Sequence, residues 1–187
     1  MRVLGINGSP RIGGNTDILL DKALEGAKSK GRETEKVILN NLKMVPCQEC
    51  EKVRDDGTCK IADDFQDLYE EKIKKADALI LASPIFFGSL SAQVKIMIDR
   101  FQCCWRYKYL LKKPVTGKQK PGALILVEAS HRESFLNNAK SIIKNLFATI
   151  DVAYKEELFC PGLEGKSDVS KHPDFLQKAF GLGERLS

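Results

Sequence analysis

The sequence predicts an α/β fold in which a five-stranded parallel sheet carries helices on both of its faces. Apolar runs rich in Val, Ile and Leu alternate with segments whose apolar residues recur every three to four positions. Nearly continuous apolar strands are typical of parallel sheets covered on both sides, and strict strand–helix alternation indicates the same architecture. We expect strands at residues 2–6, 34–39, 77–82, 122–128 and 151–159.

The segments between these strands are expected to form helices with one buried stripe each. The stripes are Ile18, Leu19, Ala23 and Ala27; Phe65, Leu68 and Ile73; Val94, Met97, Ile98 and Phe101; and Phe135, Ala139, Ile142, Ile143 and Leu146. Ligands of such sheets bind beyond the carboxyl ends of the strands. The loops after residues 6, 39, 82 and 128 are therefore where we expect the functional residues.

Length and composition favour one domain spanning residues 1–187. The chain is 43% hydrophobic and 29% charged, which is sufficient to bury one sizeable core. Its formal charge of +5 favours anionic small molecules or acidic partners. No apolar stretch reaches the length of a membrane helix and no signal peptide is evident, so we expect a cytoplasmic protein that does not contact a membrane. Nucleic-acid binding is not favoured, because only one basic segment would support it.

The first loop, NGSPRIGGNT at residues 7–16, has the composition of a phosphate site. Its glycines allow the backbone to wrap closely around a ligand, and the helix that follows offers free N–H groups. A Gly-Lys-Ser/Thr ending and a G-x-G-x-x-G spacing are both absent, which argues against a magnesium-bound triphosphate or a dinucleotide. A terminal phosphate monoester is the predicted ligand, and a turn that serves only packing is the alternative. The expected phosphate-binding residues are Ser9, Arg11, Gly14, Asn15 and Thr16.

The loop after the third strand contains apolar residues at a place expected to be partly exposed. It begins SPIFFG at residue 83, where proline stiffens the exit from the strand and glycine allows a turn. A flat apolar ring that bonds the backbone through its polar edge would explain these residues, although paired phenylalanines are also common in cores and interfaces. The expected ring-binding residues are Pro84, Ile85, Phe86, Phe87 and Gly88.

Three segments together resemble one known family. GSPRIGGNT, SPIFFGSLSAQVKIMIDR and the closing PDFLQKAFGLGERL are similar to the NADPH-dependent FMN reductase branch of the flavodoxin-like proteins, and in particular to its iron–sulfur flavoproteins. The resemblance implies a flavodoxin-like three-layer sandwich with strand order 2-1-3-4-5 and non-covalently bound FMN near a subunit interface. It also implies a homodimer or homotetramer. The first two motifs match the family's FMN phosphate and isoalloxazine loops, and Ser130 lies in the loop that closes such sites.

Cys47, Cys50 and Cys59 form a compact run within the loop of residues 40–61. The iron–sulfur flavoproteins carry four cysteines in such a run, and Val53 occupies the place of the third one here. A cubane cluster normally takes four thiolates, so a cluster here needs another ligand or a three-iron form. Structural thiols, a zinc site and a Cys47–Cys50 disulfide are the alternatives. Cys103 and Cys104 are adjacent on a helix and point about 100° apart, so we expect both to be buried and not to share one metal.

Residues 105–120 form a basic segment that contains no acidic residue. We expect a solvated insertion, or else a surface that steers an anionic donor such as NADPH or covers a neighbouring subunit.

The predicted function is that of an FMN-dependent oxidoreductase or electron carrier. It would move electrons from NAD(P)H or a protein donor, with or without an iron–sulfur cluster, to an acceptor that the sequence does not identify. Because a bound flavin carries the chemistry, we predict no catalytic acid or base. A flavin-binding sensor or scaffold without enzymatic activity is the alternative.

Overall fold

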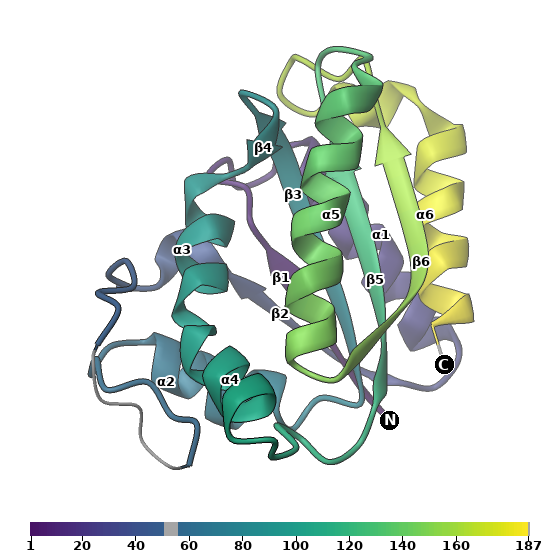
Figure 1. The fold of residues 1–187 in the computed structure, drawn as a ribbon. Coiled ribbons are helices and arrows are strands. Elements are labelled where there is room, and N and C mark those ends of the chain that lie inside the picture. The colour runs from purple at the N-terminus through teal and green to yellow at the C-terminus, as the bar shows by residue number, and fades with distance from the viewer. Residues whose placement is uncertain (51–55, 187) are drawn as a thin grey trace.

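The computed structural model describes residues 1–50 and 56–186, and its centre is a parallel sheet (Figure 1). The strand order is β2-β1-β3-β5-β6, and a two-residue strand, β4, pairs with β3 in the antiparallel sense. The predicted five-stranded parallel sheet and its order are confirmed, with β4 as an addition. The strands are β1 (Arg2–Asn7), β2 (Glu33–Ile38), β3 (Ala78–Phe86), β4 (Ser89–Leu90), β5 (Lys120–Val127) and β6 (Val152–Cys160).

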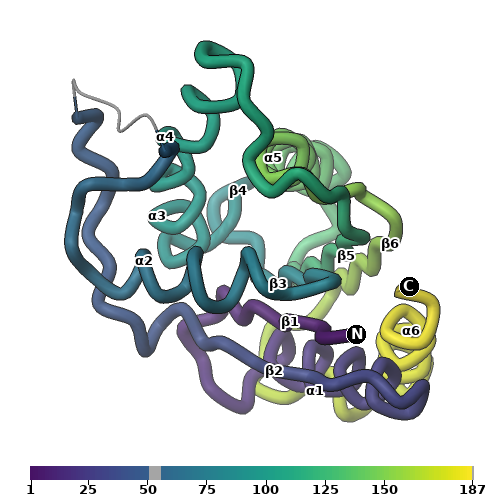
Figure 2. The backbone as a smooth tube through the Cα atoms, turned by 90° about the horizontal axis from the view of Figure 1, so that it is seen from below, coloured from purple at the N-terminus to yellow at the C-terminus, as the bar shows by residue number. Residues whose placement is uncertain are grey.

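Helices cover both faces of the sheet, and the view along the layers separates them clearly (Figure 2). α1 (Asn15–Ser29) and α6 (Pro173–Arg185) lie on one face. α3 (Ala92–Arg100), α4 (Gln102–Trp105) and α5 (Glu133–Thr149) lie on the other. The short helical segments are η1 (Leu39–Asn41), α2 (Phe65–Asp67), η2 (Leu68–Ile73), η3 (Arg106–Leu110) and η4 (Asp168–Lys171).

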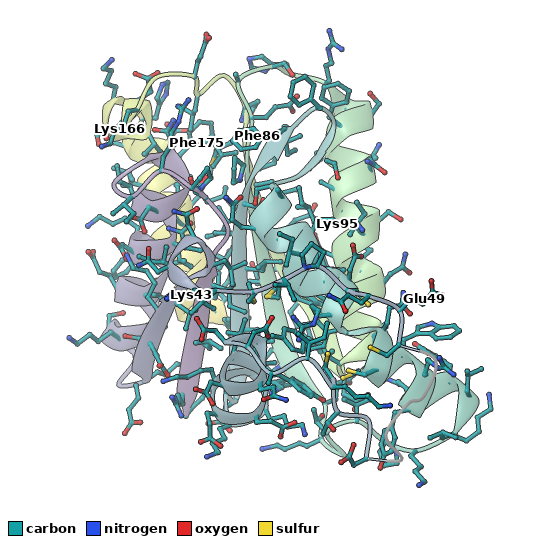
Figure 3. The ribbon with its side chains drawn as sticks, turned by 90° about the vertical axis from the view of Figure 1, so that its left-hand side faces the viewer. Lys43, Glu49, Phe86, Lys95, Lys166 and Phe175 are labelled. Carbon is teal, nitrogen blue, oxygen red and sulfur yellow. The ribbon has the colours of Figure 1, made fainter. Side chains whose placement is uncertain are left out.

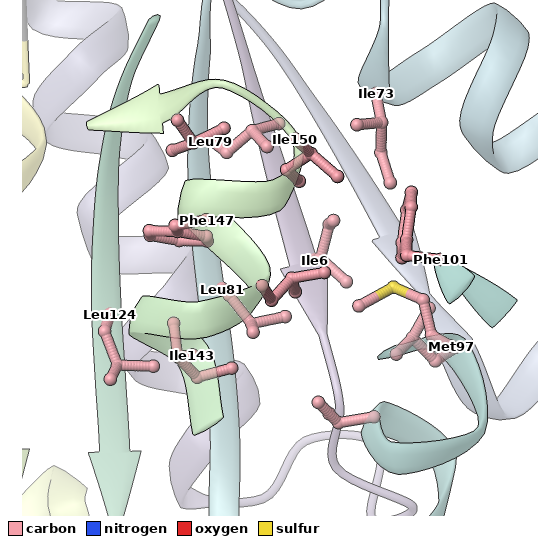
Figure 4. Close-up of a cluster of buried hydrophobic side chains, with 14 of the residues drawn as sticks. Ile6, Ile73, Leu79, Leu81, Met97, Phe101, Leu124, Ile143, Phe147 and Ile150 are labelled. Atoms are coloured by element: carbon pink, nitrogen blue, oxygen red, sulfur yellow. The ribbon is translucent and has the colours of Figure 1, made fainter. Parts of the chain in front are cut away.

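Each face of the sheet buries its own apolar cluster, because successive side chains of a strand point to opposite faces. Leu79 and Leu81 of β3 pack with Phe147 of α5 on the face shown in Figure 4, whereas Ala78 and Ile80 pack against α1 and α6. The sheet is therefore held between two apolar layers, as the continuous apolar strands predict.

α1 and α6 approach each other at glycines. A methyl group added to Gly26 would lie 2.0 Å from the carbonyl oxygen of Phe180, and one added to Gly183 would lie 1.8 Å from that of Ala23. The backbones of the two helices are thus in direct contact, which explains the glycines at positions 26 and 183.

One expectation about the loops is corrected. Residues 83–86 continue β3 instead of forming a loop, because Ile85 and Phe86 pair with Leu90 and Ser89 of β4. No residue from 105 to 119 of the basic segment is buried, and Lys108 forms an ion pair with Asp151, which lies between α5 and β6. Val53 of the cysteine loop lies outside the described residues.

No helix in the described part of the chain is long and apolar enough to cross a membrane.

Candidate functional site

A pocket of about 180 Å³ opens at the carboxyl ends of the parallel strands, and we call it the strand-end pocket. Four segments of the chain contribute to it, and the figure with side chains shows two of its residues, Phe86 and Lys166, at the same end of the molecule (Figure 3). The lining consists of Ser9, Arg11, Gly14, Asn15, Thr16, Pro84, Ile85, Phe86, Val127, Ala129, Leu163, Glu164 and Lys166. The structure therefore brings together most of the residues predicted for the first two loops.

Two buried side chains that the sequence analysis did not select hold the first loop in shape. Asn7 accepts a hydrogen bond from the Ser9 amide at 2.8 Å and donates one to Asp17 at 2.8 Å. Asp17 also accepts from the Gly13 amide at 2.8 Å. A polar Asn at the end of an apolar strand and an Asp in the first turn of a helix were the signals available in the sequence.

Asp17 is ionised inside this network. Burial on its own would raise its pKa, but hydrogen bonds from the Gly13 amide and from Lys36, whose Nζ lies 2.9 Å away, lower it below the ordinary value of 3.8. The carboxylate thereby fixes the backbone of the loop from behind, opposite to the pocket that the loop lines.

The end of the pocket formed by this loop is suited to an anion. α1 begins at Asn15, and its first N–H groups have no partners within the helix. Arg11 and Lys166 add positive charge from two different loops, and the buried Thr16 adds a hydroxyl group. These are the groups that bind a terminal phosphate.

Asn15 lines the pocket, but its side chain also holds the loop that follows β6. Its Nδ2 donates to the carbonyl oxygen of Gly165 at 2.8 Å, and its Oδ1 accepts from the amide of Val169 at 3.0 Å. Ser167 fastens the same loop by donating to the carbonyl oxygen of Gly13 at 2.8 Å. This loop forms a wall of the pocket that the sequence analysis missed, because its residues carry no recognisable motif.

The opposite end of the pocket is apolar. Pro84, Ile85 and Phe86 line it, and Phe86 is 43% exposed. Phe87 is fully exposed, has a φ of +49° and is not part of the lining. Gly88 has a φ of +75°, which closes the turn between β3 and β4. Of the five residues predicted to bind a ring, three thus line the pocket, while the exposed Phe87 and the buried Gly88 do not.

Ser130 is also outside the lining. Its hydroxyl group donates to the carboxylate of Glu128, which is buried at the end of β5. The other oxygen of Glu128, Oε2, has no hydrogen-bond partner among the described residues. From this loop, Ala129 contributes to the pocket in place of Ser130.

The three predicted metal ligands lie elsewhere, around a second cavity that we call the cysteine pocket. Its volume is about 230 Å³, and Cys47, Cys50, Cys59 and Cys103 all line it. The three cysteines named as possible ligands therefore line this cavity and not the strand-end pocket. Glu49 of this pocket lies well away from Phe86 and Lys166 in Figure 3, and the two pockets share no lining residue.

A buried arginine supports Cys59 in this second cavity. Arg100 donates through Nε and Nη2 to the sulfur of Cys59, each at 3.2 Å, and through Nη1 to Asp63 at 2.6 Å. Burial on its own would raise the pKa of Asp63, but the hydrogen bond from Arg100 lowers it below its ordinary value. The neighbouring thiols of Cys103 and Cys104 are 3.9 Å apart, and this contact together with burial raises the pKa of Cys103.

Comparison with known proteins identifies the family. The model of a family described as NADPH-dependent FMN reductase matches residues 1–153. The chain belongs to this family. This finding confirms the resemblance seen in the motifs, and the matched residues include every segment of the strand-end pocket except the loop after β6.

Curated relatives and solved structures agree with this assignment. An iron–sulfur flavoprotein of Methanosarcina thermophila is 40% identical over 115 residues, which cover 62% of this chain and 60% of that protein. An iron–sulfur flavoprotein of Archaeoglobus fulgidus is 29% identical over 188 residues, covering 100% of this chain and 79% of that protein. The match to the first relative thus spans about three fifths of its length.

The fold of this family member resembles those of solved structures. A flavone reductase superposes with a TM-score of 0.76 at 22% identity, covering 100% of this chain and 62% of the other. A flavodoxin from the domain Archaea superposes with a TM-score of 0.59 at 14% identity, covering 100% and 96%. At these identities the likeness shows the fold, and it confirms that the fold is flavodoxin-like.

Proposed function

We propose that the chain is an FMN-dependent oxidoreductase or electron carrier, with FMN bound in the strand-end pocket. The observation that carries the proposal is that one pocket joins a phosphate-binding end to an apolar end. Ser9, Arg11 and Thr16 would hold the phosphate at the start of α1, and Ile85 and Phe86 would contact the ring. The family match and the flavoprotein relatives support the same ligand.

The size of the pocket favours a second copy of the chain as part of the complete site. Pockets that enclose a ligand of this size have volumes of about 300–1,000 Å³, and the strand-end pocket has about 180 Å³. Part of the ring would therefore lie on the rim, where Phe86 and the fully exposed Phe87 offer apolar surface. Exposed aromatic residues beside a pocket are typical of interfaces, and we propose a homodimer or homotetramer.

The residues of the pocket would position the flavin and control access to it. Bound FMN supplies the redox chemistry, taking up electrons from NAD(P)H or a protein donor and passing them on. Arg11 and Lys166 would neutralise the phosphate, and Asn7 and Asp17 would keep the loop rigid around it. A relative in Bacillus subtilis bears the name of a putative NAD(P)H-dependent FMN-containing oxidoreductase, which supports NAD(P)H as the donor.

Three further expectations belong to this proposal. Residues 1–187 act as one FMN-binding domain with the cysteine loop 40–61 and the basic insertion 105–120. The acceptor is a small molecule or a protein. The location is cytoplasmic, where a reducing environment would maintain the six free cysteines.

Titration of the chain with FMN tests the placement of the phosphate. Thr16→Val keeps the shape of the side chain and removes its hydroxyl group, and we expect FMN affinity to fall about tenfold, the loss of about one charge-assisted hydrogen bond. Thr149→Val is the matched control, because that buried hydroxyl bonds only within α5, to the carbonyl oxygen of Asn145 at 2.8 Å. Equal affinity of the two variants for FMN would exclude the proposed placement.

Anaerobic mixing of the FMN-loaded chain with NADPH, followed by an electron acceptor, distinguishes the redox proposal from a sensor or scaffold. Bleaching of the flavin band and its return with the acceptor are expected. A chain that binds FMN tightly but exchanges no electrons with NADPH, dithionite or a carrier protein would be a binding module instead.

A further inference from the structure

The cysteine pocket collects four thiols from two parts of the chain that are far apart in sequence. Cys47, Cys50 and Cys59 come from the loop of residues 40–61, and Cys103 comes from α4. Three cysteines leave one corner of a cubane cluster without a thiolate, and four complete the set. We propose that Cys103 is the fourth ligand of an iron–sulfur cluster held in this pocket.

The break between α3 and α4 selects Cys103 over its neighbour. α3 ends at Arg100 and α4 begins at Gln102, while Phe101 is buried between them against the rings of Phe65 and Tyr69, at 5.0 and 5.2 Å. This anchor fixes the start of α4, where the sulfur atoms of Cys103 and Cys104 lie 3.9 Å apart but differ in exposure.

Cys103 is half-buried and lines the pocket, where its thiol donates to the carbonyl oxygen of Arg100 at 3.3 Å. Cys104 is 1% exposed and belongs to the apolar core. Only the first of the two adjacent thiols can therefore reach a group in the cavity.

The walls of the pocket match the charge of a cluster with thiolate ligands, which is negative. Lys60, Arg100 and Arg106 all line it. Nε of Arg106 is buried and has no hydrogen-bond partner in the part of the chain that the structure describes. An unsatisfied buried N–H group is costly, and a sulfide or thiolate in the cavity would accept its hydrogen bond.

Two thiols already accept the hydrogen bonds that stabilise ligated sulfur. The amide of Glu49 donates to the sulfur of Cys47 at 3.4 Å. Arg100 donates twice to Cys59. Donors of this kind are also the means by which a protein sets the potential of a cluster.

A cluster fits this pocket better than a single ion does. Among residues 1–50 and 56–186, no three cysteine, histidine or carboxylate side chains converge closely enough to hold one metal ion. In a cubane cluster each of the four thiolates binds a different iron, so the thiolates need not converge on one point. The cavity of about 230 Å³ is several times the roughly 30 Å³ of a water molecule, so it has room for more than a single ion. Each cysteine loses its thiol proton to solvent as its Fe–S bond forms.

This inference extends the proposed function, because a cluster would give the chain a second redox centre, but its test does not depend on the first. The two pockets share no lining residue, so FMN and iron can be measured separately in one sample. A variant that loses iron but still binds FMN would therefore report on the cysteine pocket alone.

The test uses the full chain, purified without oxygen and reconstituted with ferrous iron and sulfide. Iron, acid-labile sulfide and released FMN are measured per chain, together with the EPR spectra of oxidised and reduced samples. The wild type, Cys103→Ser and Cys104→Ser are compared, and the last variant is the matched control from the adjacent position. In the double variant Val53→Cys/Cys103→Ser, the cysteine that the loop lacks is restored.

We expect a four-iron cluster in the wild type and in Cys104→Ser, with about four irons per chain. Cys103→Ser should hold about three irons or none, and the EPR signal of an oxidised three-iron cluster should appear in place of the four-iron one. The double variant should return to about four irons, which shows that the pocket still folds. Unchanged iron content and spectra in Cys103→Ser would overturn the proposal, and so would a wild type that takes up FMN but no iron.

Discussion

Removing the charge of Asp17 should destabilise the loop that is proposed to bind phosphate. In Asp17→Asn, one carboxylate oxygen becomes an NH₂ group, while the Gly13 amide, Asn7 and Lys36 all still donate toward this position. The least costly orientation keeps the remaining oxygen on Asn7 and Lys36, and it leaves the new NH₂ group, on a side chain that is 6% exposed in the wild type, facing the Gly13 amide instead of an acceptor. An unsatisfied buried donor costs about 1–3 kcal/mol, and the bond from Lys36 is weakened in addition. We expect the free energy of unfolding to fall by about 2 kcal/mol.

The pH dependence of this difference identifies the carboxylate as its cause. The pKa of Asp17 in the folded chain lies below 3.8, whereas an unfolded Asp has a pKa of about 3.9. The stability contributed by the charged form is therefore present above about pH 4 and is lost as the pH falls through the folded pKa. Urea unfolding curves of the two proteins should differ at neutral pH and converge below about pH 4.

The control for this prediction is Asp21→Asn. Asp21 also binds Lys36, but its side chain is 49% exposed, and exposed pairs contribute about 0–1 kcal/mol. A loss in Asp17→Asn no larger than that in Asp21→Asn would refute the reasoning. A difference that stays constant below the pKa of Asp17 would also refute it.

Three other measurements test the same structure. In Gly26→Ala the added methyl group meets the backbone of α6 at 2.0 Å, so we expect the free energy of unfolding, measured in urea, to fall by about 2–3 kcal/mol. In the control Gly31→Ala only the φ of +72° opposes the change, and the expected decrease is about 1–2 kcal/mol. Asn15→Ala removes the two hydrogen bonds that hold the loop after β6, and amide exchange in that loop should accelerate about tenfold or more. FMN affinity should decrease with salt in the wild type, and this dependence should be weaker in Arg11→Gln/Lys166→Gln, because screening shortens from about 10 Å at 0.1 M to about 3 Å at 1 M. An exchange rate equal to that of the wild type, or an identical salt dependence, would contradict the assigned contacts.

The sheet and its order were predictable because apolar runs and helical spacing are local properties of the sequence. Each of the five long strands lies within a few residues of its predicted range, and the largest difference is at β3. There the strand continues through Phe86, because it pairs with β4. The pattern Ser-Pro-Ile-Phe-Phe-Gly does not predict this pairing. A two-residue strand is too short to show any periodicity.

The phosphate end of the site was predictable to a similar extent, since glycines and hydroxyl groups at the start of a helix are also local. The remaining walls depend on contacts between distant segments. Asn15 meets the loop after β6 at Gly165 and Val169, and no pattern in the sequence connects these positions. Asp17 was overlooked for the opposite reason, because an acidic residue in the first turn of a helix is common and needs no special role.

The cysteines show how a correct local argument can lead to an incomplete conclusion. Adjacent residues on a helix diverge by about 100°, and on that ground we expected both thiols to be buried and not to share one metal. In the structure their sulfur atoms lie 3.9 Å apart, but Cys104 is buried in the core whereas Cys103 is half-buried. The anchor at Phe101 places Cys104 in the core, and this orientation directs Cys103 toward the pocket that Cys47, Cys50 and Cys59 line. A missing ligand in a compact motif is therefore best sought among the residues that the fold packs against that motif, not among its neighbours in sequence.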